Sequence, residues 1–308
     1  MSLLGTRAPV LPGAADPLAG PAGATATTPA GAPRRRTTRR HPLTRPGPLV
    51  ALLALALVAA WALVPGAFTS HDPLTGVPAD RLLPPGAAHW FGTDHLGRDL
   101  FSRTVHGTGL SLQAALVAIG IALVAGSLTG LVAGVAGGWV DDVLMRGADV
   151  LLAIPGLLLS LAVVTVLGFG TVKVAIAVGV ASVATFARVM RAQVLRVRHA
   201  TYVEAARLAG AGRVAVVLRH VVPNSAAPVL ALATVELGAV VLAVSALSFL
   251  GFGATPPTPE WGSLVAEGRN YLAVAWWYST LPGAVIAVVV LAAGRLGRAI
   301  EREGRTAR

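Results

Sequence analysis

Long runs of apolar residues, separated by short polar segments, dominate the chain from residue 49 onward. They lie at six places: 49–64, 110–136, 150–167, 174–186, 229–250 and 281–296. A helix needs about 20 mostly apolar residues, each rising about 1.5 Å, to cross a bilayer. The run at 174–186 reaches that length only with its neighbours, roughly 171–190. A buried helix of a soluble protein fits one such run, but six in one chain predict an all-α membrane protein with about six transmembrane helices.

The segment 1–46 differs from the rest, because it is rich in Pro, Gly, Ala, Thr and Arg and has no hydrophobic periodicity. Such a segment buries too little apolar surface to offset its conformational entropy, so we expect it to be disordered. A basic flank before the run at 49–64 also fits a cleaved signal peptide. The length of the flank and the spans that follow favour an uncleaved anchor.

Composition supports the membrane interpretation, since 55% of the 308 residues are hydrophobic, only 13% are charged and the mean hydropathy is +0.70. Soluble domains carry nearer to 25% charged residues. The chain has no cysteine, which excludes disulfides and thiolate metal sites.

The net charge of +11 first suggests a nucleic-acid partner. The basic residues are not spread evenly, however: seven Arg lie in 1–46, seven in 188–219 and five in 295–308. Arg and Lys concentrate in cytoplasmic loops, so both termini and the loop between the fourth and fifth spans are predicted to be cytoplasmic. The charge then sets topology and attracts anionic lipid headgroups, and no nucleic-acid partner is expected.

This pattern predicts three parts. A cytoplasmic tail covers 1–46, a transmembrane domain covers 47–300, and a second cytoplasmic tail covers 301–308. Within the domain we expect a first span at 49–64, an outer loop at 65–109, spans at 110–190, a cytoplasmic loop at 191–228 and spans at 229–296. Two details bear on packing: small residues repeat at Gly126, Gly130 and Gly134, which permits close helix approach, and Pro155 is placed to kink the third span.

The cytoplasmic loop carries the most informative pattern. Thr201 followed by Glu204 predicts a capping box, and Ala205 and Ala206 are strong helix formers. Gly210 or Gly212 then supplies the end of the helix. Read from the residues alone, this is a short helix with a small-residue face, which fits either a protein partner or the membrane surface.

This loop resembles the EAA loop of bacterial ABC importer permeases. The resemblance rests on Glu204, Ala205, Ala206 and Gly210, followed by Pro223 and Asn224. It implies the type I importer permease fold, in which this helix docks on a cytoplasmic ATPase. The implied partners are two ABC ATPase subunits, a second homologous permease forming a heterodimer, and an extracytoplasmic solute-binding protein.

Residues 92–103 narrow the branch of the family. They resemble a segment of the "C" subunit of dipeptide, oligopeptide and nickel permeases, through Gly92, Thr93, Asp94, Gly97, Arg98 and Asp99. With residues 245–271 the resemblance covers roughly 45–302. It implies import of di- or oligopeptides, with nickel or glutathione as alternatives. Gly97, Arg98 and Asp99 fit either a local turn with an ion pair, which we favour, or a contact with the partner permease.

Glu236 is a carboxylate inside a predicted span, which is costly unless it faces a cavity or a partner. Many relatives carry an acidic residue where this chain has Val244. Four roles stay open for Glu236: contact with a peptide ammonium, lining of the pore, pairing with a basic residue of the partner subunit, or a protonated side chain bonded to a neighbouring helix.

Several chemistries lack the residues that they need. A P-loop requires Gly-Lys-Ser/Thr, and Lys173 is the only lysine in the chain. ATP hydrolysis is therefore expected on another polypeptide, and no catalytic, cofactor-binding or metal-ligating residues are predicted. The alternatives are a secondary transporter that uses Glu236 as its ion site and, ranked last, a membrane-tethered nucleic-acid regulator.

Overall fold

A computed structural model describes residues 46–306, and their regular structure is helical. Within this range the one pairing of extended backbone is an isolated bridge between Thr93 and Asp99. The helices are α1 (Pro46–Leu63), α2 (Leu100–Ala136), α3 (Gly138–Ala153), α4 (Gly156–Leu167), α5 (Thr171–Arg198), α6 (Thr201–Leu208), α7 (Arg213–Val216), α8 (Val222–Phe249), α9 (Trp261–Gly268) and α10 (Trp276–Thr306). The predicted all-α fold is confirmed.

Each predicted apolar run falls on helical structure, and the run at 150–167 is divided between the end of α3 and α4. Four helical stretches are long and apolar enough to cross a membrane, namely α2, α5, the stretch from α7 through α8, and α10. The helices α3 and α4 meet that criterion only as a pair, and α1 is a shorter apolar helix. The described residues thus hold four such spans, or five if the bent pair counts as one.

Some helices begin or end inside the predicted parts. The predicted disordered tail lies outside the described residues, except for Pro46, which begins α1. At the other end α10 continues to Thr306, through most of the predicted tail at 301–308. Helix α2 begins at Leu100, inside the predicted outer loop at 65–109, because Asp99 caps it by accepting a 2.6 Å hydrogen bond from the Ser102 amide. Hydropathy could not reveal this start, since the first turns of α2 include the buried polar residues Ser102, Arg103 and Thr104.

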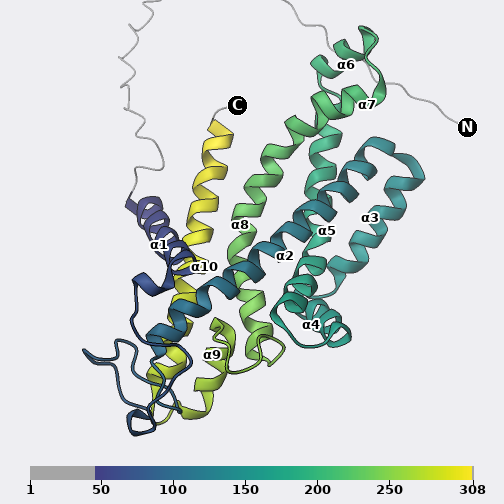
Figure 1. The fold of residues 1–308 in the computed structure, drawn as a ribbon. Helices are drawn as coiled ribbons and strands as arrows, with labels where there is room; N and C mark the ends of the chain where they lie inside the picture. Colours follow the sequence, from purple (N-terminus) through teal and green to yellow (C-terminus); the bar gives the residue numbers. More distant parts are fainter. Residues whose placement is uncertain (1–45, 307–308) are drawn as a thin grey trace, which may run out of the picture. The chain divides into compact units, whose positions relative to one another are not determined.

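The helix pair α2 and α5 forms the most extensive contact in this part of the chain (Figure 1). The repeated glycines lie where α5 approaches α2. A Cβ atom at Gly130 would collide with the carbonyl oxygen of Ala187, and one at Gly134 would lie 2.7 Å from Cγ1 of Val194. The small residues therefore permit the close approach that their spacing predicts.

Pro155 breaks its span instead of kinking it, since α3 and α4 meet at 96°. Ile154, the residue before the proline, is extended, as expected when a proline follows. Two ion pairs then fasten α3 to α5. Arg191 Nη2 lies 2.6 Å from Asp141 Oδ2, and Arg188 Nη2 lies 2.5 Å from Asp149 Oδ1.

The elements that carry the predicted coupling loop and the predicted outer segment lie at two ends of this helical bundle (Figure 1). One end carries α6, α7 and the last turns of α10. The other carries residues 64–99 and α9, and we call it the outer end after its predicted side. The bent pair α3–α4 lies between these ends, beside α5.

Candidate functional site

The helix α6 begins differently from the prediction. Ala200 is the N-cap and Thr201 is the first helical residue, with no side-chain cap bond. The carbonyl oxygen of Ala200 instead accepts from the amides of Val203 and Glu204, at 2.9 and 3.2 Å. The predicted capping box is therefore wrong, because the chain enters the helix one residue too early for Thr201 to cap it.

Of the two candidate glycines, Gly210 ends α6. Its φ of +85° is a left-handed conformation that favours glycine. The amide of Ala211 donates to the carbonyl of Ala206 at 3.1 Å, and the amide of Gly210 donates to that of Arg207 at 3.0 Å. These bonds form a Schellman motif, which satisfies the last carbonyls of the helix. Gly212 instead precedes α7 as its N-cap.

One side of α6 is fixed to the bundle and the other is free. Val203 is fully buried in an apolar cluster with Val194 of α5, Val216 of α7 and Val229 of α8. By helical spacing the opposite face holds Thr201, Glu204, Ala205 and Leu208, all exposed. Leu208 is 90% exposed, so α6 presents an apolar and acidic face without a partner within the described residues.

The second half of the loop motif lies elsewhere. Between α7 and α8 the chain forms a π-helical segment at Val217–Val221. Pro223 and Asn224 follow in the first turn of α8, and Asn224 Nδ2 donates to the carbonyl of His220 at 2.7 Å. The motif thus does not form one cluster, since Pro223 and Asn224 shape the entry to α8 while Glu204 and Ala205 lie on α6. Within the predicted cytoplasmic loop at 191–228, α5 continues to Arg198 and α8 begins at Val222, so residues 199–221 connect the two long helices.

At the outer end, the segment 92–99 forms a tight turn. Gly97 adopts a φ of +75°, and a Cβ atom there would collide with the Val77 carbonyl oxygen. The Asp94 amide donates to the carbonyl of Arg98 at 3.0 Å. Thr93 donates from its hydroxyl to the Asp80 carbonyl and accepts from the Leu83 amide at 2.8 Å.

The ion pair in this turn joins Arg98 to Asp94 and not to Asp99. Arg98 Nε lies 2.6 Å from Asp94 Oδ2. Asp99 has two other tasks, because it caps α2 and binds Nδ1 of His89 at 2.8 Å. The Gly92 turn is equally constrained, since its φ is +73°.

Three residues outside the predicted set complete the charge cluster. Arg103 Nη2 donates to Glu267 Oε2 at 3.2 Å, and Tyr278 donates from its hydroxyl to the same oxygen at 2.9 Å. Arg98 Nη2 lies 3.6 Å from that carboxylate as well. We call Asp94, Arg98, Arg103, Glu267 and Tyr278 the outer-end network. It ties the turn to α2, α9 and α10, over sequence separations that no local motif reveals.

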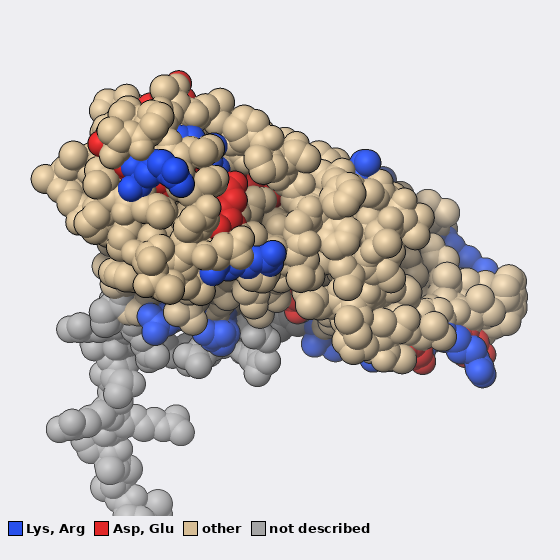
Figure 2. All heavy atoms as spheres, turned by 90° about the horizontal axis from the view of Figure 1, so that it is seen from below, with Lys and Arg blue, Asp and Glu red and all other residues tan. Residues whose placement is uncertain are grey.

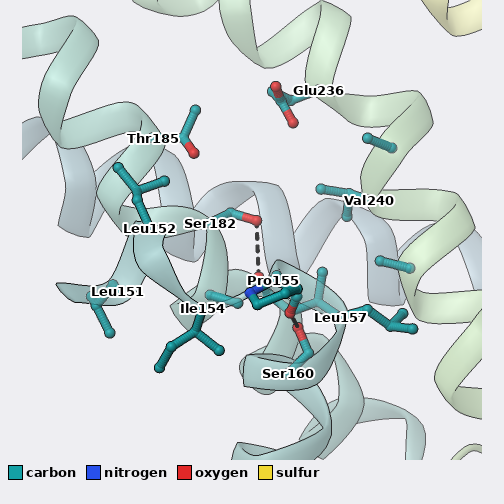
Figure 3. A pocket seen from close by; sticks show the side chains of 15 residues that line it. Leu151, Leu152, Ile154, Pro155, Leu157, Ser160, Ser182, Thr185, Glu236 and Val240 are labelled. Carbon is teal, nitrogen blue, oxygen red and sulfur yellow. Dashed lines mark hydrogen bonds between the residues drawn. The ribbon is translucent and has the colours of Figure 1, made fainter. Parts of the chain in front are cut away.

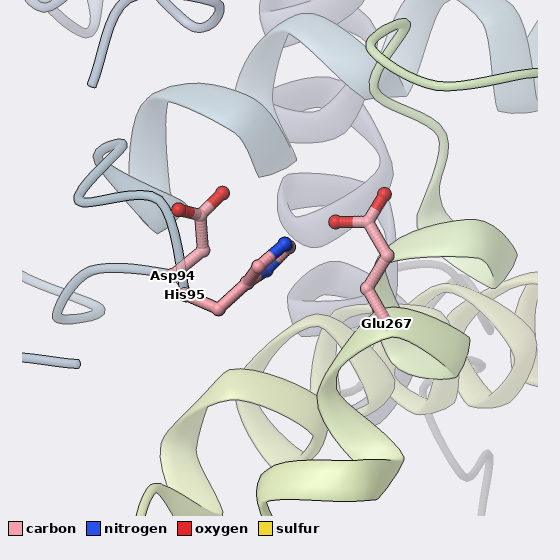
Figure 4. A group of neighbouring side chains, drawn as sticks. All are labelled: Asp94, His95 and Glu267. Carbon is pink, nitrogen blue, oxygen red and sulfur yellow. The ribbon is translucent and has the colours of Figure 1, made fainter. Parts of the chain in front are cut away.

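Asp94, His95 and Glu267 point toward one another, with ligand atoms within 4.8 Å (Figure 4). Their geometry alone would suit a metal ion. Both carboxylates already pair with the guanidinium groups of Arg98 and Arg103, however, so positive charge surrounds the position that a cation would take. The view from this end shows several separate patches of basic and acidic side chains among uncharged ones (Figure 2). We assign the cluster to structure.

Glu236 lines a pocket of about 330 Å³ between the α3–α4 break, α5 and α8 (Figure 3). The side chain is half-buried. No hydrogen bond or ion pair reaches its carboxylate from the residues that the structure describes. Ser182 and Thr185 of α5 and Ser160 of α4 line the same pocket.

Comparison with known proteins finds a matching family and several similar transport proteins. A family described as "Binding-protein-dependent transport system inner membrane component" matches residues 126–305. The chain is 39% identical over 252 residues to a probable D,D-dipeptide transport system permease protein of Escherichia coli K12, covering 82% of this chain and 83% of the relative. It is 40% identical over 257 residues to a di/tripeptide transport system permease protein of Pseudomonas aeruginosa, covering 82% and 85%.

A third relative is a glutathione transport system permease protein of Pectobacterium atrosepticum, 38% identical over 266 residues, which covers 85% of this chain and 86% of the relative. Among solved structures, "Crystal structure of an amino acid ABC transporter with histidines" matches with a TM-score of 0.51 at 16% identity, over 65% of this chain and 94% of that chain. It supports the fold alone. The chain belongs to the family of binding-protein-dependent transport system inner membrane components.

Proposed function

We propose that this multi-pass plasma-membrane protein forms half of a solute path with a second homologous permease, and that α6 couples it to a pair of cytoplasmic ATPases. A binding protein delivers the solute at the outer end. The observation that carries the coupling role is the outward face of α6, with Leu208 90% exposed beside Glu204. An exposed leucine beside a carboxylate and the small side chain of Ala205 on one helix face fits contact with a protein partner.

The proposed solutes are small peptides. The three relatives are named for D,D-dipeptides, di- and tripeptides, and glutathione. Nickel is the second candidate, but the Glu236 pocket has no His side chain in its lining, and imidazole is a preferred nickel ligand. Family membership also replaces the secondary-transporter alternative, in which Glu236 would be the ion site.

The test is co-purification of the ATPases with the complete permease pair, together with peptide uptake. In a Glu204→Ala, Gly210→Leu double variant, the charge on the face is lost and the left-handed position is strained. We expect loss of ATPase binding and of uptake. Val172→Ala, at an exposed position at the start of α5, is the control and should retain both. A double variant that binds ATPases and imports peptide normally would refute the coupling role.

A further inference from the structure

The pocket beside Glu236 lies where a span is broken. The α3–α4 break contributes Ile154, Pro155 and Gly156 to its wall. At a helix break, carbonyls of the last turn and amides of the next first turn lose their helical partners. At membrane depth such backbone is tolerated only where it is buried in protein or lines a water-filled cavity. The pocket therefore suits a polar occupant better than a lipid chain.

The polar side chains of this pocket offer acceptors. The Ser182 hydroxyl donates its proton to the carbonyl of Val178 at 3.0 Å, and the Ser160 hydroxyl donates to that of Gly156 at 2.8 Å. What each hydroxyl leaves facing the cavity is oxygen lone pairs. Glu236, when ionised, is an acceptor only. Figure 3 shows it on α8, across the pocket from Thr185 and Ser182 of α5. Among the side chains of the lining, Glu236 carries the one ionisable group, so these side chains favour a positively charged donor.

The same lining selects an organic cation over a metal ion. A hard cation such as Ca²⁺ requires six to eight oxygen ligands, about 2.3–2.6 Å away, and the pocket supplies one carboxylate and a few hydroxyls. A primary ammonium needs only three acceptors. The rest of the wall is apolar, with Leu152, Leu157 and Val240 among its members, so it fits the aliphatic part of a small amine-bearing solute.

We propose that Glu236, with the hydroxyls of Ser182 and Thr185, forms a subsite in the solute path for the N-terminal ammonium of a free peptide. The proposal rests on the proposed function, since it assigns one end of the peptide to one place on this subunit. Pairing with the ammonium compensates the carboxylate for its half-buried position in a span.

The absence of cysteine from this chain allows a direct test. Ala239→Cys, at an exposed position of the lining that supplies no ligand, is placed in the complete transporter, and its labelling by 2-aminoethyl methanethiosulfonate is compared with labelling by the anionic 2-sulfonatoethyl reagent. We expect a strong preference for the ammonium reagent. Adding Glu236→Gln should lower that preference about tenfold, which corresponds to ~1.4 kcal/mol. Alanyl-alanine should slow the labelling, and N-acetyl-alanyl-alanine should not.

Two controls separate the outcomes. Val143→Cys on α3 is exposed and lies outside the pocket lining, so its labelling preference should not respond to Glu236→Gln. Asp142→Asn removes an exposed carboxylate outside the lining and should leave the preference at Ala239→Cys unchanged. An unchanged preference in Glu236→Gln, or no protection by alanyl-alanine, would overturn the subsite. Failure of the wild-type transporter to import alanyl-alanine would instead count against peptides as solutes, whatever the labelling shows.

Discussion

Arg103 is a fully buried cation whose neutralisation depends on residues from other elements. Its Nη2 binds Glu267, and its Nη1 lies 3.6 Å from Asp94. Removing one partner of a buried pair is costly because the remaining charge stays desolvated. The outer-end network therefore stabilises the fold, and we expect substitutions in it to lower the free energy of unfolding more than they lower the rate of transport.

For Glu267→Gln we expect a loss of about 3 kcal/mol in the free energy of unfolding, the lower range for a broken buried pair. Tyr278→Phe removes only one hydrogen bond to the same carboxylate and should cost about 1 kcal/mol. Thermal unfolding of the purified protein in detergent measures both. Equal melting temperatures for Glu267→Gln and the wild type would show that the network does not stabilise the fold.

The buried carboxyl group of Glu260 predicts that the stability of the fold depends on pH. Burial raises the pKa of its carboxyl above the ordinary 4.5, and hydrogen bonds from the Ala254 amide and the Ser263 hydroxyl offset part of the rise. The fold thus favours the neutral acid, so this contribution to stability is complete below pH 4.5 and falls as pH increases above it. The melting temperature of the wild type minus that of Glu260→Gln should decrease from acidic to neutral pH. A constant difference would contradict the raised pKa.

Sequence identified part of the outer-end network but not its pairing. The motif drew attention to Asp94, Arg98 and Asp99, yet backbone geometry decides that Arg98 meets Asp94 while Asp99 caps α2. Glu267 was beyond reach, because its contact with Arg103 spans 164 residues.

At the scale of elements, hydropathy located every long helix but not its ends. An apolar run indicates residues buried in lipid or in the core. It does not detect helical turns whose polar residues are buried through ion pairs, as at the start of α2. Pro155 was expected to kink a span. The structure shows a 96° break, with α3 and α4 both packed against α5, and a single proline does not specify that angle.

The α2–α5 contact gives an element-scale prediction with a matched control. Gly130→Ala places a Cβ atom against the Ala187 backbone, and overpacking of this kind costs about 1–3 kcal/mol. Gly120→Ala on the same helix meets nothing within 4 Å, and should be neutral or stabilising by up to ~1 kcal/mol. Folded yield and melting temperature in detergent distinguish them. Similar values for the two variants would show that α2 and α5 can separate freely.

For the whole molecule, the Arg distribution predicts that α6 is cytoplasmic and that residues 64–99 are outside. Leu208→Cys and Trp90→Cys occupy positions that are 90% and 64% exposed, one at each end. With a membrane-impermeant maleimide, Trp90→Cys should label in sealed cells and Leu208→Cys only after permeabilisation. The cysteine-free parent chain controls for background. The reverse pattern would invert the topology.

The Glu236 pocket forms only when the whole chain folds, because its lining comes from α3, α4, α5 and α8. Sequence placed Glu236 in a span and left four roles open, because nothing local brings it near the α3–α4 break. The folded chain sets the carboxylate beside that break, with no partner for it among the described side chains.

The π-helical segment at Val217–Val221 has a mechanical consequence. A π turn and the proline at Pro228 both interrupt the regular backbone hydrogen bonds of a helix. The glycine contacts instead hold α2 and α5 closely packed. If a partner displaces α6, we therefore expect the helix axis to bend at Val217–Val221 before the α2–α5 pair deforms. Pro228 lies eight residues from Glu236, about 12 Å along the axis of α8. A small change of the helix angle at Val217–Pro228 would therefore displace the Glu236 carboxylate within its pocket.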